Sequence, residues 1–202
     1  IKSMNYHPVI QYFVAEGVPV ETVYLLLMLP VIATLVAFFR QIVGIKAFGI
    51  YTPSIITFAL LAFDPNGLKY GIAIFVSVIA VGTLSRLLMK KFRLLYLPRV
   101  AMTVSIVSLS ILGILVLGGM THRTGLAAVS IFPLLIMITL AEKFVATQSE
   151  KGSRIALILA VETLVISVAG YFLIGWNTLI TLVLMYPWII LFTFVINFSL
   201  GK

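Results

Sequence analysis

The sequence predicts an all-α polytopic membrane helix bundle of seven spans, and three observations lead to this. Hydrophobic residues make up 62% of the 202 residues and charged residues 10%, whereas ordinary soluble domains carry roughly 25% charged residues. A soluble fold of this size needs a polar shell that this composition cannot supply. The apolar residues also fall in long runs, and the chain length allows about seven crossings of a ~30 Å hydrocarbon core.

The spans are expected at residues 20–39, 48–63, 69–89, 100–120, 124–141, 154–174 and 178–199. The last two need a turn between them, because the 39 residues from Thr163 to Gly201 carry no formal charge and would measure about 58 Å as one helix. Gly175, Trp176 and Asn177 supply that turn, since they combine a helix stop, an interfacial aromatic ring and a turn former. Residues 1–19 mix aromatic and charged side chains and are expected to form an interfacial segment ahead of the membrane domain at 20–202.

The charge pattern predicts an amino terminus outside and a carboxyl terminus inside. With that orientation, eleven of the fourteen Lys and Arg residues fall on the inner side, as the positive-inside rule requires. These residues are Arg40, Lys46, Arg86, Lys90, Lys91, Arg93, Arg99, Lys143, Lys151, Arg154 and Lys202. The bilayer therefore accounts for most of the net charge of +8, and no nucleic-acid partner is expected.

The second run leaves an alternative open, because it has only 16 residues and contains Pro53. It could dip into the membrane and return on the same side as a re-entrant segment. That version has six spans, both termini inside and a charge split of 10 to 4, so charge counting prefers seven spans only slightly.

Two prolines suggest broken helices and an internal repeat. Pro53 and Pro133 lie 80 residues apart, near the starts of the second and fifth spans. Proline removes a backbone donor and can interrupt a membrane helix, leaving polar groups that need partners. If spans one to three and four to six are repeats, they form a 3+3 inverted repeat, which in transporters points to a midplane binding site. The alternative is that proline is simply commoner in membrane helices.

Glu162 is the carboxylate expected inside the membrane. It stands eight residues into the sixth span, where burial costs about 2.5 to 3.5 kcal/mol on insertion scales. We expect it to face the bundle interior with a partner, either Arg86 or the hydroxyl cluster of the fourth span. Two roles are open for Glu162: a relay for protons or substrate, and a neutral residue that packs in the bundle.

Two charged connections are expected on the cytoplasmic side. The connection from Lys90 to Arg99, which includes Tyr96, fits topology control and anionic-lipid contact, or a docking face for an acidic polymer, phosphate or partner protein. The cluster with Glu142, Lys143 and Gln148 is interpreted as a solvated helix end. Catalytic motifs and metal-ligand spacings are absent from the sequence, as is cysteine, so we expect no enzyme activity, no cofactor and no metal site.

Three strings of residues carry a resemblance to a known family. They are Arg40 and Gln41 with Gly44 to Lys46 and Phe48 to Pro53, then Leu94 to Arg99, then Ser130 to Pro133 followed by Ala141 to Gln148. They resemble the bacterial family of seven-transmembrane domains usually fused to an inactive transglutaminase-like domain. The resemblance implies a bacterial inner-membrane location, a second run that crosses, and an extracytoplasmic transglutaminase-like domain ahead of Ile1. Residues 1–19 would then be the linker from that domain.

A second and weaker resemblance runs from Gly49 to Met102. This stretch is similar to the small membrane subunit of poly-gamma-glutamate capsule synthesis. The seven-span family is associated, by what its resemblance implies, with cytosolic ATP-grasp ligases of the glutamate-ligase type. Both resemblances imply a membrane partner of a ligase that polymerises an amino acid.

We therefore expect a non-enzymatic inner-membrane subunit that partners such a ligase and handles or exports its anionic polymer. The alternatives are a signal-transducing receptor membrane domain and a small-solute secondary transporter, and a homo-oligomer is left open. A transporter should have a polar cavity reaching Glu162, whereas a transducer needs none. The candidate substrate-binding residues are Arg40, Gln41, Lys46, Tyr51, Thr52, Pro53, Arg86, Tyr96, Arg99, Pro133, Glu142, Lys143, Gln148 and Glu162.

Overall fold

The fold is all helical over the residues that the computed structural model describes, which are 7–62, 67–89, 96–120 and 131–201. For residues 67, 96, 97, 115, 117–120 and 131, the structure describes the backbone and not the side chain. The chain divides into two compact units, one made of residues 1–45 with 169–202 and the other of residues 46–168. The expected all-α class is confirmed for these residues.

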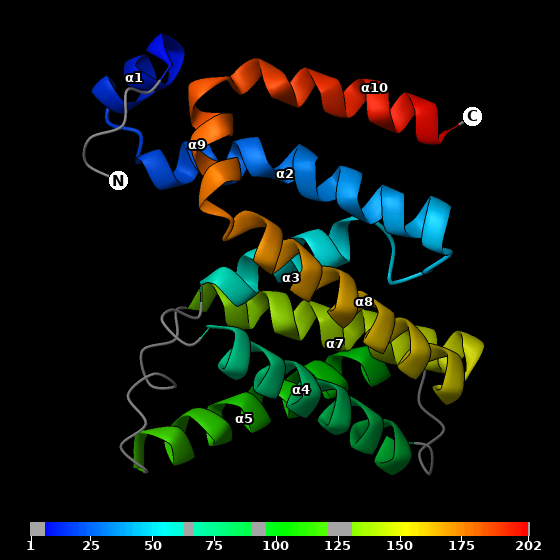
Figure 1. The fold of residues 1–202 in the computed structure, drawn as a ribbon. Helices are drawn as coiled ribbons and strands as arrows, with labels where there is room; N and C mark the ends of the chain where they lie inside the picture. The colour runs from blue at the N-terminus through cyan, green and yellow to red at the C-terminus, as the bar shows by residue number, and fades with distance from the viewer. Residues whose placement is uncertain (1–6, 63–66, 90–95, 121–130, 202) are drawn as a thin grey trace. The chain divides into compact units, whose positions relative to one another are not determined.

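The first unit is built around α2 (Val20–Phe38), against which α10 (Ile190–Leu200) packs along its length (Figure 1). A π-helical turn, η1 (Phe39–Val43), continues α2. The short α1 (Pro8–Ala15) and α9 (Asn177–Met185) complete the unit, with Ile10, Val23 and Leu184 as its buried apolar cluster. Asn197 Nδ2 donates to Thr34 Oγ1 at 2.9 Å, which ties α10 to α2.

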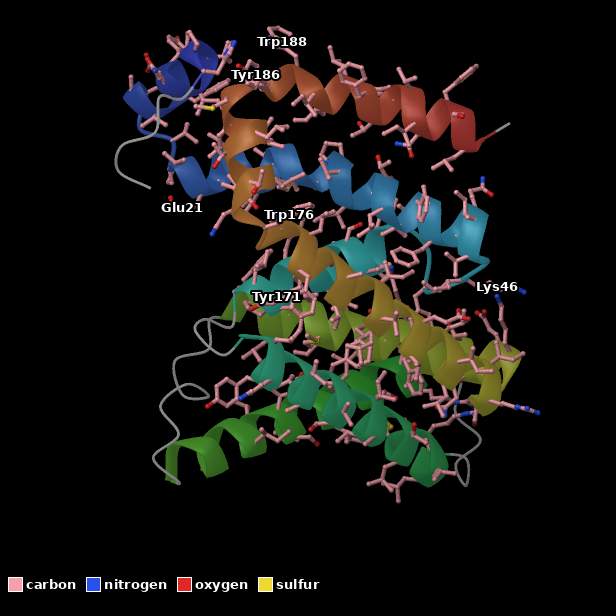
Figure 2. The ribbon with its side chains drawn as sticks, in the orientation of Figure 1. Glu21, Lys46, Tyr171, Trp176, Tyr186 and Trp188 are labelled. Atoms are coloured by element: carbon pink, nitrogen blue, oxygen red, sulfur yellow. The ribbon has the colours of Figure 1, made fainter. Side chains whose placement is uncertain are left out.

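The turn predicted after the sixth span is confirmed, but the seventh run is bent. Helix α8 (Ser153–Ile174) ends just before Gly175, and α9 begins at Asn177. The run expected as the seventh span, 178–199, bends by 100° between α9 and the helical stretch Pro187–Leu200, and its crossing of the membrane stays a prediction. That stretch opens with the 3-10 turn η2 (Pro187–Ile189), and a proline there has no N–H to continue the helix. The aromatic rings of Trp176, Tyr186 and Trp188 are exposed in this unit (Figure 2).

The second unit is arranged around α7 (Ile131–Lys151). Helices α3 (Tyr51–Leu61), α4 (Gly67–Met89) and α5 (Tyr96–Met120) all pack against it (Figure 1). Its central position explains why Met137, Leu140, Ala141, Phe144 and Val145 are almost fully buried. The fifth span was expected to end at residue 141, but α7 continues to Lys151, because its inward-facing side chains remain in the core. A single residue, Gly152, joins α7 to α8.

The expected interruption of a helix by proline is wrong at Pro53, and α7 is unbroken after Pro133. Pro53 occupies the third position of α3, whereas the residues that precede Ile131 in front of Pro133 lie outside the described ones. A proline in the first helical turn is tolerated, because its missing N–H would have no partner within the helix. The two proline-bearing helices nevertheless pack against each other. The inverted repeat stays a prediction.

Three of the described helices are long and apolar enough to cross a membrane by themselves: Val20–Val43, Leu68–Met89 and Ser153–Ile174. The bent α9 and α10 pair meets the criterion together. Helix α3 has 11 residues, a length of about 17 Å that cannot cross a ~30 Å core alone. The helices are consistent with a membrane helical bundle, and the number of crossings stays a prediction.

Candidate functional site

The irregular backbone before α3 presents three N–H groups to α8. Ala47 and Gly49 have φ values of 41° and 90°, a left-handed geometry that takes the loop out of helical hydrogen bonding. The N–H groups of Lys46 and Ala47 donate to Glu162 Oε2 at 3.0 and 3.2 Å. The next N–H, of Phe48, donates to Thr163 Oγ1 at 3.0 Å. We name these five residues the Glu162 cradle.

The cradle gives Glu162 a partner that differs from both expected ones. Arg86 Nη1 donates instead to Ser153 Oγ at 2.6 Å, and the α5 hydroxyls of Thr103, Ser105 and Ser110 donate to carbonyls four residues back in α5. A carboxylate that accepts backbone N–H bonds is stabilised without a basic side chain. The expectation that Glu162 has a partner is confirmed, and both expected partners were wrong.

Buried hydroxyl groups fasten α3 to α8 beside the cradle. Thr57 Oγ1 lies 3.1 Å from the carbonyl oxygen of Ser167, and Ser167 Oγ lies 3.1 Å from that of Pro53. Thr57, Thr163 and Ser167 have no solvent exposure. The sequence reasoning missed all three, although the four-residue spacing of Thr163 and Ser167 places them on one face of α8.

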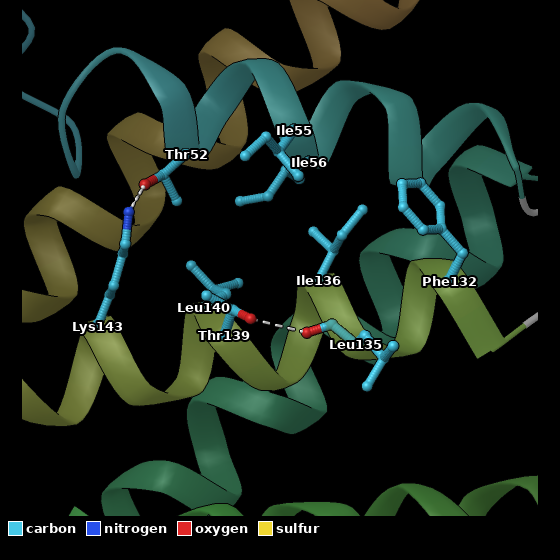
Figure 3. A pocket seen from close by; sticks show the side chains of 9 residues that line it. All are labelled: Thr52, Ile55, Ile56, Phe132, Leu135, Ile136, Thr139, Leu140 and Lys143. Carbon is cyan, nitrogen blue, oxygen red and sulfur yellow. Dashed lines mark hydrogen bonds between the residues drawn. The ribbon is translucent and has the colours of Figure 1, made fainter. Parts of the chain in front are cut away.

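A cavity of about 240 Å³ lies between α3 and α7. The two helices run in opposite directions there, with Thr52 and Lys143 at one end and Phe132 at the other (Figure 3). Lys143 Nζ donates to Thr52 Oγ1 at 2.8 Å. The remaining lining residues are Ile55, Ile56, Leu135, Ile136, Thr139 and Leu140. This α3–α7 cavity is therefore apolar with one cationic end, and Glu162 is not part of its lining.

Basic side chains gather at one side of the second unit. The amino ends of α3, α5 and α8 and the carboxyl ends of α4 and α7 lie on that side (Figure 1). Six of the seven described Lys and Arg side chains in residues 46–168 lie at or near these ends: Lys46, Arg86, Arg99, Lys143, Lys151 and Arg154. We name them the basic end. Lys69 alone among the seven lies at the amino end of α4, on the opposite side. This is consistent with the alternation predicted from charge.

Gln148 corrects the idea of a solvated helix end in α7. Its side chain is only 1% exposed, and Nε2 donates to Ser153 Oγ at 3.3 Å. The same Ser153 oxygen accepts from Arg86, so three helices meet at this hydroxyl. Gln148 Oε1 is buried and has no hydrogen-bond partner among the described residues, which is uncommon for a buried amide oxygen. Glu142, in the same α7 segment, is exposed as expected.

The structure brings some of the predicted site residues together and leaves others apart. Lys46, Thr52, Pro53, Lys143 and Glu162 surround the amino end of α3, whereas Arg86 and Gln148 meet at Ser153. The remaining candidates are placed as follows: Arg40 and Gln41 are exposed on η1 in the first unit, Tyr51 is exposed, Arg99 is half-buried in the first turn of α5, Pro133 is buried, and the Tyr96 side chain lies outside the described residues. Over the described ranges, no group of three or more His, Asp or Glu side chains could hold a metal ion.

Residues 4–202 match the sequence model of a family described as seven transmembrane helices usually fused to an inactive transglutaminase. The chain belongs to this family. The resemblance found in the sequence strings is thereby confirmed, and the chain is a multi-pass membrane protein domain of the transglutaminase-associated type. No curated protein matches the chain, and no solved structure matches it.

Proposed function

We propose that this chain is a non-enzymatic inner-membrane domain that docks a cytosolic ATP-grasp, glutamate-type ligase and handles its anionic polymer. The observation that carries the proposal is the basic end, where six lysine and arginine side chains lie on one side of the second unit. A polyanion is attracted to such a cluster, and each basic residue near a charged surface contributes about 1 kcal/mol.

The side chains of the basic end are suited to carboxylates. Arg86 uses Nη1 to reach Ser153, which fixes the guanidinium while its other N–H groups stay available for bidentate contacts. Lys46 is exposed and projects from the ribbon on the same side (Figure 2). Lys151 and Arg154 are exposed on either side of Gly152. A chain of γ- or α-linked glutamates could therefore meet several cations in succession.

The α3–α7 cavity does not suit the polymer, because its walls are largely Ile, Leu and Phe. Moving carboxylates into apolar surroundings is costly unless each charge is paired. The polymer is therefore handled at the surface of the basic end.

A second hypothesis, that the chain is the membrane domain of a signal-transducing receptor, is favoured by a different observation. Glu162 is bound by backbone N–H groups in the cradle, an arrangement that fixes a loop rather than moves protons. An inactive enzyme domain fused ahead of such a bundle would act as the sensor. The third hypothesis, secondary transport of a small solute, predicts that Glu162→Gln abolishes the coupling of transport to protons.

The docking proposal is tested with the full chain in phosphatidylcholine nanodiscs and fluorescent poly-L-glutamate as the probe. Lys151→Gln with Arg154→Gln should weaken binding about thirtyfold, the effect of two residues at about 1 kcal/mol each. Lys69→Gln on the opposite side is the control and should change binding less than twofold. Equal effects of the two variants would contradict the proposal.

Export is tested separately in liposomes that hold the full chain together with the ligase. Arg86→Ala with Arg99→Ala should reduce the amount of polymer that crosses the membrane. Unchanged export by this variant would contradict an export role while leaving the binding result to stand by itself. A sensor would instead respond to ligands on the extracytoplasmic side and bind poly-L-glutamate no better than the basic-end variant does.

A further inference from the structure

We propose that the α3–α7 cavity is a binding site for an anionic phospholipid, with one acyl chain in the cavity and the phosphate on Lys143. This inference goes beyond the proposed function and does not rest on it. It starts from the contrast between the two ends of the cavity, one cationic and one aromatic (Figure 3).

The walls of the cavity fit a hydrocarbon chain. Ile56 and Leu140 are fully buried at its floor, while Ile55, Phe132 and Leu135 are 42%, 59% and 54% exposed at its opening. An opening lined by exposed apolar side chains on a membrane domain faces acyl chains more readily than water. A lipid tail can therefore enter sideways, between the two helices.

The volume of about 240 Å³ limits what the cavity can hold. An apolar cavity of about 150 Å³ takes a benzene molecule, and drug-sized ligands occupy roughly 300 to 1,000 Å³. The α3–α7 cavity thus holds a section of one chain, not a whole lipid. The head group must lie outside, at the end where Thr52 and Lys143 stand.

Lys143 supplies the charge complementarity. Its ammonium has three donors, of which one goes to Thr52 Oγ1. Among the described residues this hydroxyl is its partner, and no carboxylate there forms an ion pair with it. Thr52 Oγ1 donates onward to the carbonyl of Phe48 at 2.9 Å, so the hydroxyl holds the ammonium in place without neutralising it. Two ammonium protons are left for an anion.

The amino end of α3 adds to the positive potential at that point. Helix α3 begins at Tyr51, beside Thr52, and in the described part of the chain it has no side-chain cap at its amino end. These groups carry the positive end of the helix dipole. The Lys143 side chain is also exposed at this end of the cavity, so its long stem can present the ammonium to a head group outside. Phosphate rather than a neutral head group is therefore the expected ligand.

The test uses the purified full chain in detergent, titrated with phosphatidylglycerol and with phosphatidylcholine of the same acyl chains, with bound lipid counted by native mass spectrometry. The wild-type chain should bind phosphatidylglycerol about fivefold more tightly, as one lysine near an anionic head group predicts. Lys143→Gln should remove this preference. Lys151→Gln, on the same helix but outside the cavity, is the charge control and should keep it.

A second variant tests the cavity itself. Ile136→Trp fills the space and should weaken binding of both lipids at least tenfold, whereas Leu112→Trp, on an exposed face of α5, should weaken neither. If Ile136→Trp fails to fold, Ile55→Trp fills the cavity from its more exposed side and should give the same result. The proposal is overturned if Lys143→Gln keeps the preference or if a folded cavity-filling variant binds both lipids normally. If inorganic phosphate competes with phosphatidylglycerol and binds with equal affinity, the assignment to a lipid is overturned and the site is one for free phosphate.

Discussion

Removing the carboxylate of Glu162 should release the loop that precedes α3. In Glu162→Ala, the N–H groups of Lys46 and Ala47 both lose their acceptor. Water can replace it at Lys46, where the bond is exposed, so that loss costs about 1 kcal/mol. Ala47 is 7% exposed, and its lost bond to a charged acceptor costs about 2 kcal/mol. Local opening should become easier by about 3 kcal/mol, or more than a hundredfold.

Hydrogen exchange measures this directly, because amide exchange reports local opening. In Glu162→Ala, the amides of residues 46 and 47 should exchange more than a hundredfold faster than in the wild type. Glu162→Gln keeps a neutral acceptor of roughly half the strength and should give about a tenfold increase. Glu142→Ala removes an exposed carboxylate from α7 and is the matched control. Exchange in Glu162→Ala within twofold of the wild type would refute the reasoning.

Three further predictions concern packing and turns. Gly152 has a φ of 91° with open space around it, so Gly152→Ala should lower the stability of the full chain by about 1 to 2 kcal/mol through backbone strain alone, measured by thermal unfolding in detergent. A Cβ at Gly82 would lie 3.4 Å from the Phe144 ring, so Gly82→Ala should be nearly neutral whereas Gly82→Leu should cost about 1 to 3 kcal/mol by overpacking. Asn197→Leu removes the bond to Thr34 and should cost about 0.6 kcal/mol, the average for an interhelical hydrogen bond in membranes.

Each of these three has an outcome that would contradict it. Gly152→Asn should be milder than Gly152→Ala, since asparagine tolerates the left-handed region, and equal melting temperatures for the two would argue against strain. A Gly82→Leu chain as stable as Gly82→Ala would mean that α4 and α7 are not in close contact. Thr34→Val combined with Asn197→Leu should cost little more than either change alone, and full additivity would exclude the bond between them.

The sequence predicted helices and turns where hydropathy and local residue types decide them. The turn at Gly175 to Asn177 was predicted because a charge-free run of that length must fold back, and α8 and α9 meet there. The bend at Pro187 was missed, although proline was its signal. The end of α7 was also missed, because hydropathy falls after Ala141 while Phe144 and Val145 still pack inward.

The candidate site was predictable only in its residue types. Glu162 was singled out because a carboxylate is costly within a membrane helix. Its partner could not be predicted, because the donors are backbone N–H groups, which every residue carries, and their direction depends on the left-handed geometry at Ala47 and Gly49. Lys143 was predicted as part of a solvated helix end, whereas its contact with Thr52 depends on how α3 packs against α7.

The connection through Gly152 alone couples the positions of α7 and α8. A joint of one residue has no slack, so a sideways shift of α7 must carry the first turn of α8 with it. Helix α7 carries Lys143 and one wall of the α3–α7 cavity, and α8 carries Glu162. The loop held by Glu162 leads directly into α3, so the spacing between α3 and α7 and the hydrogen bonds of that loop depend on each other.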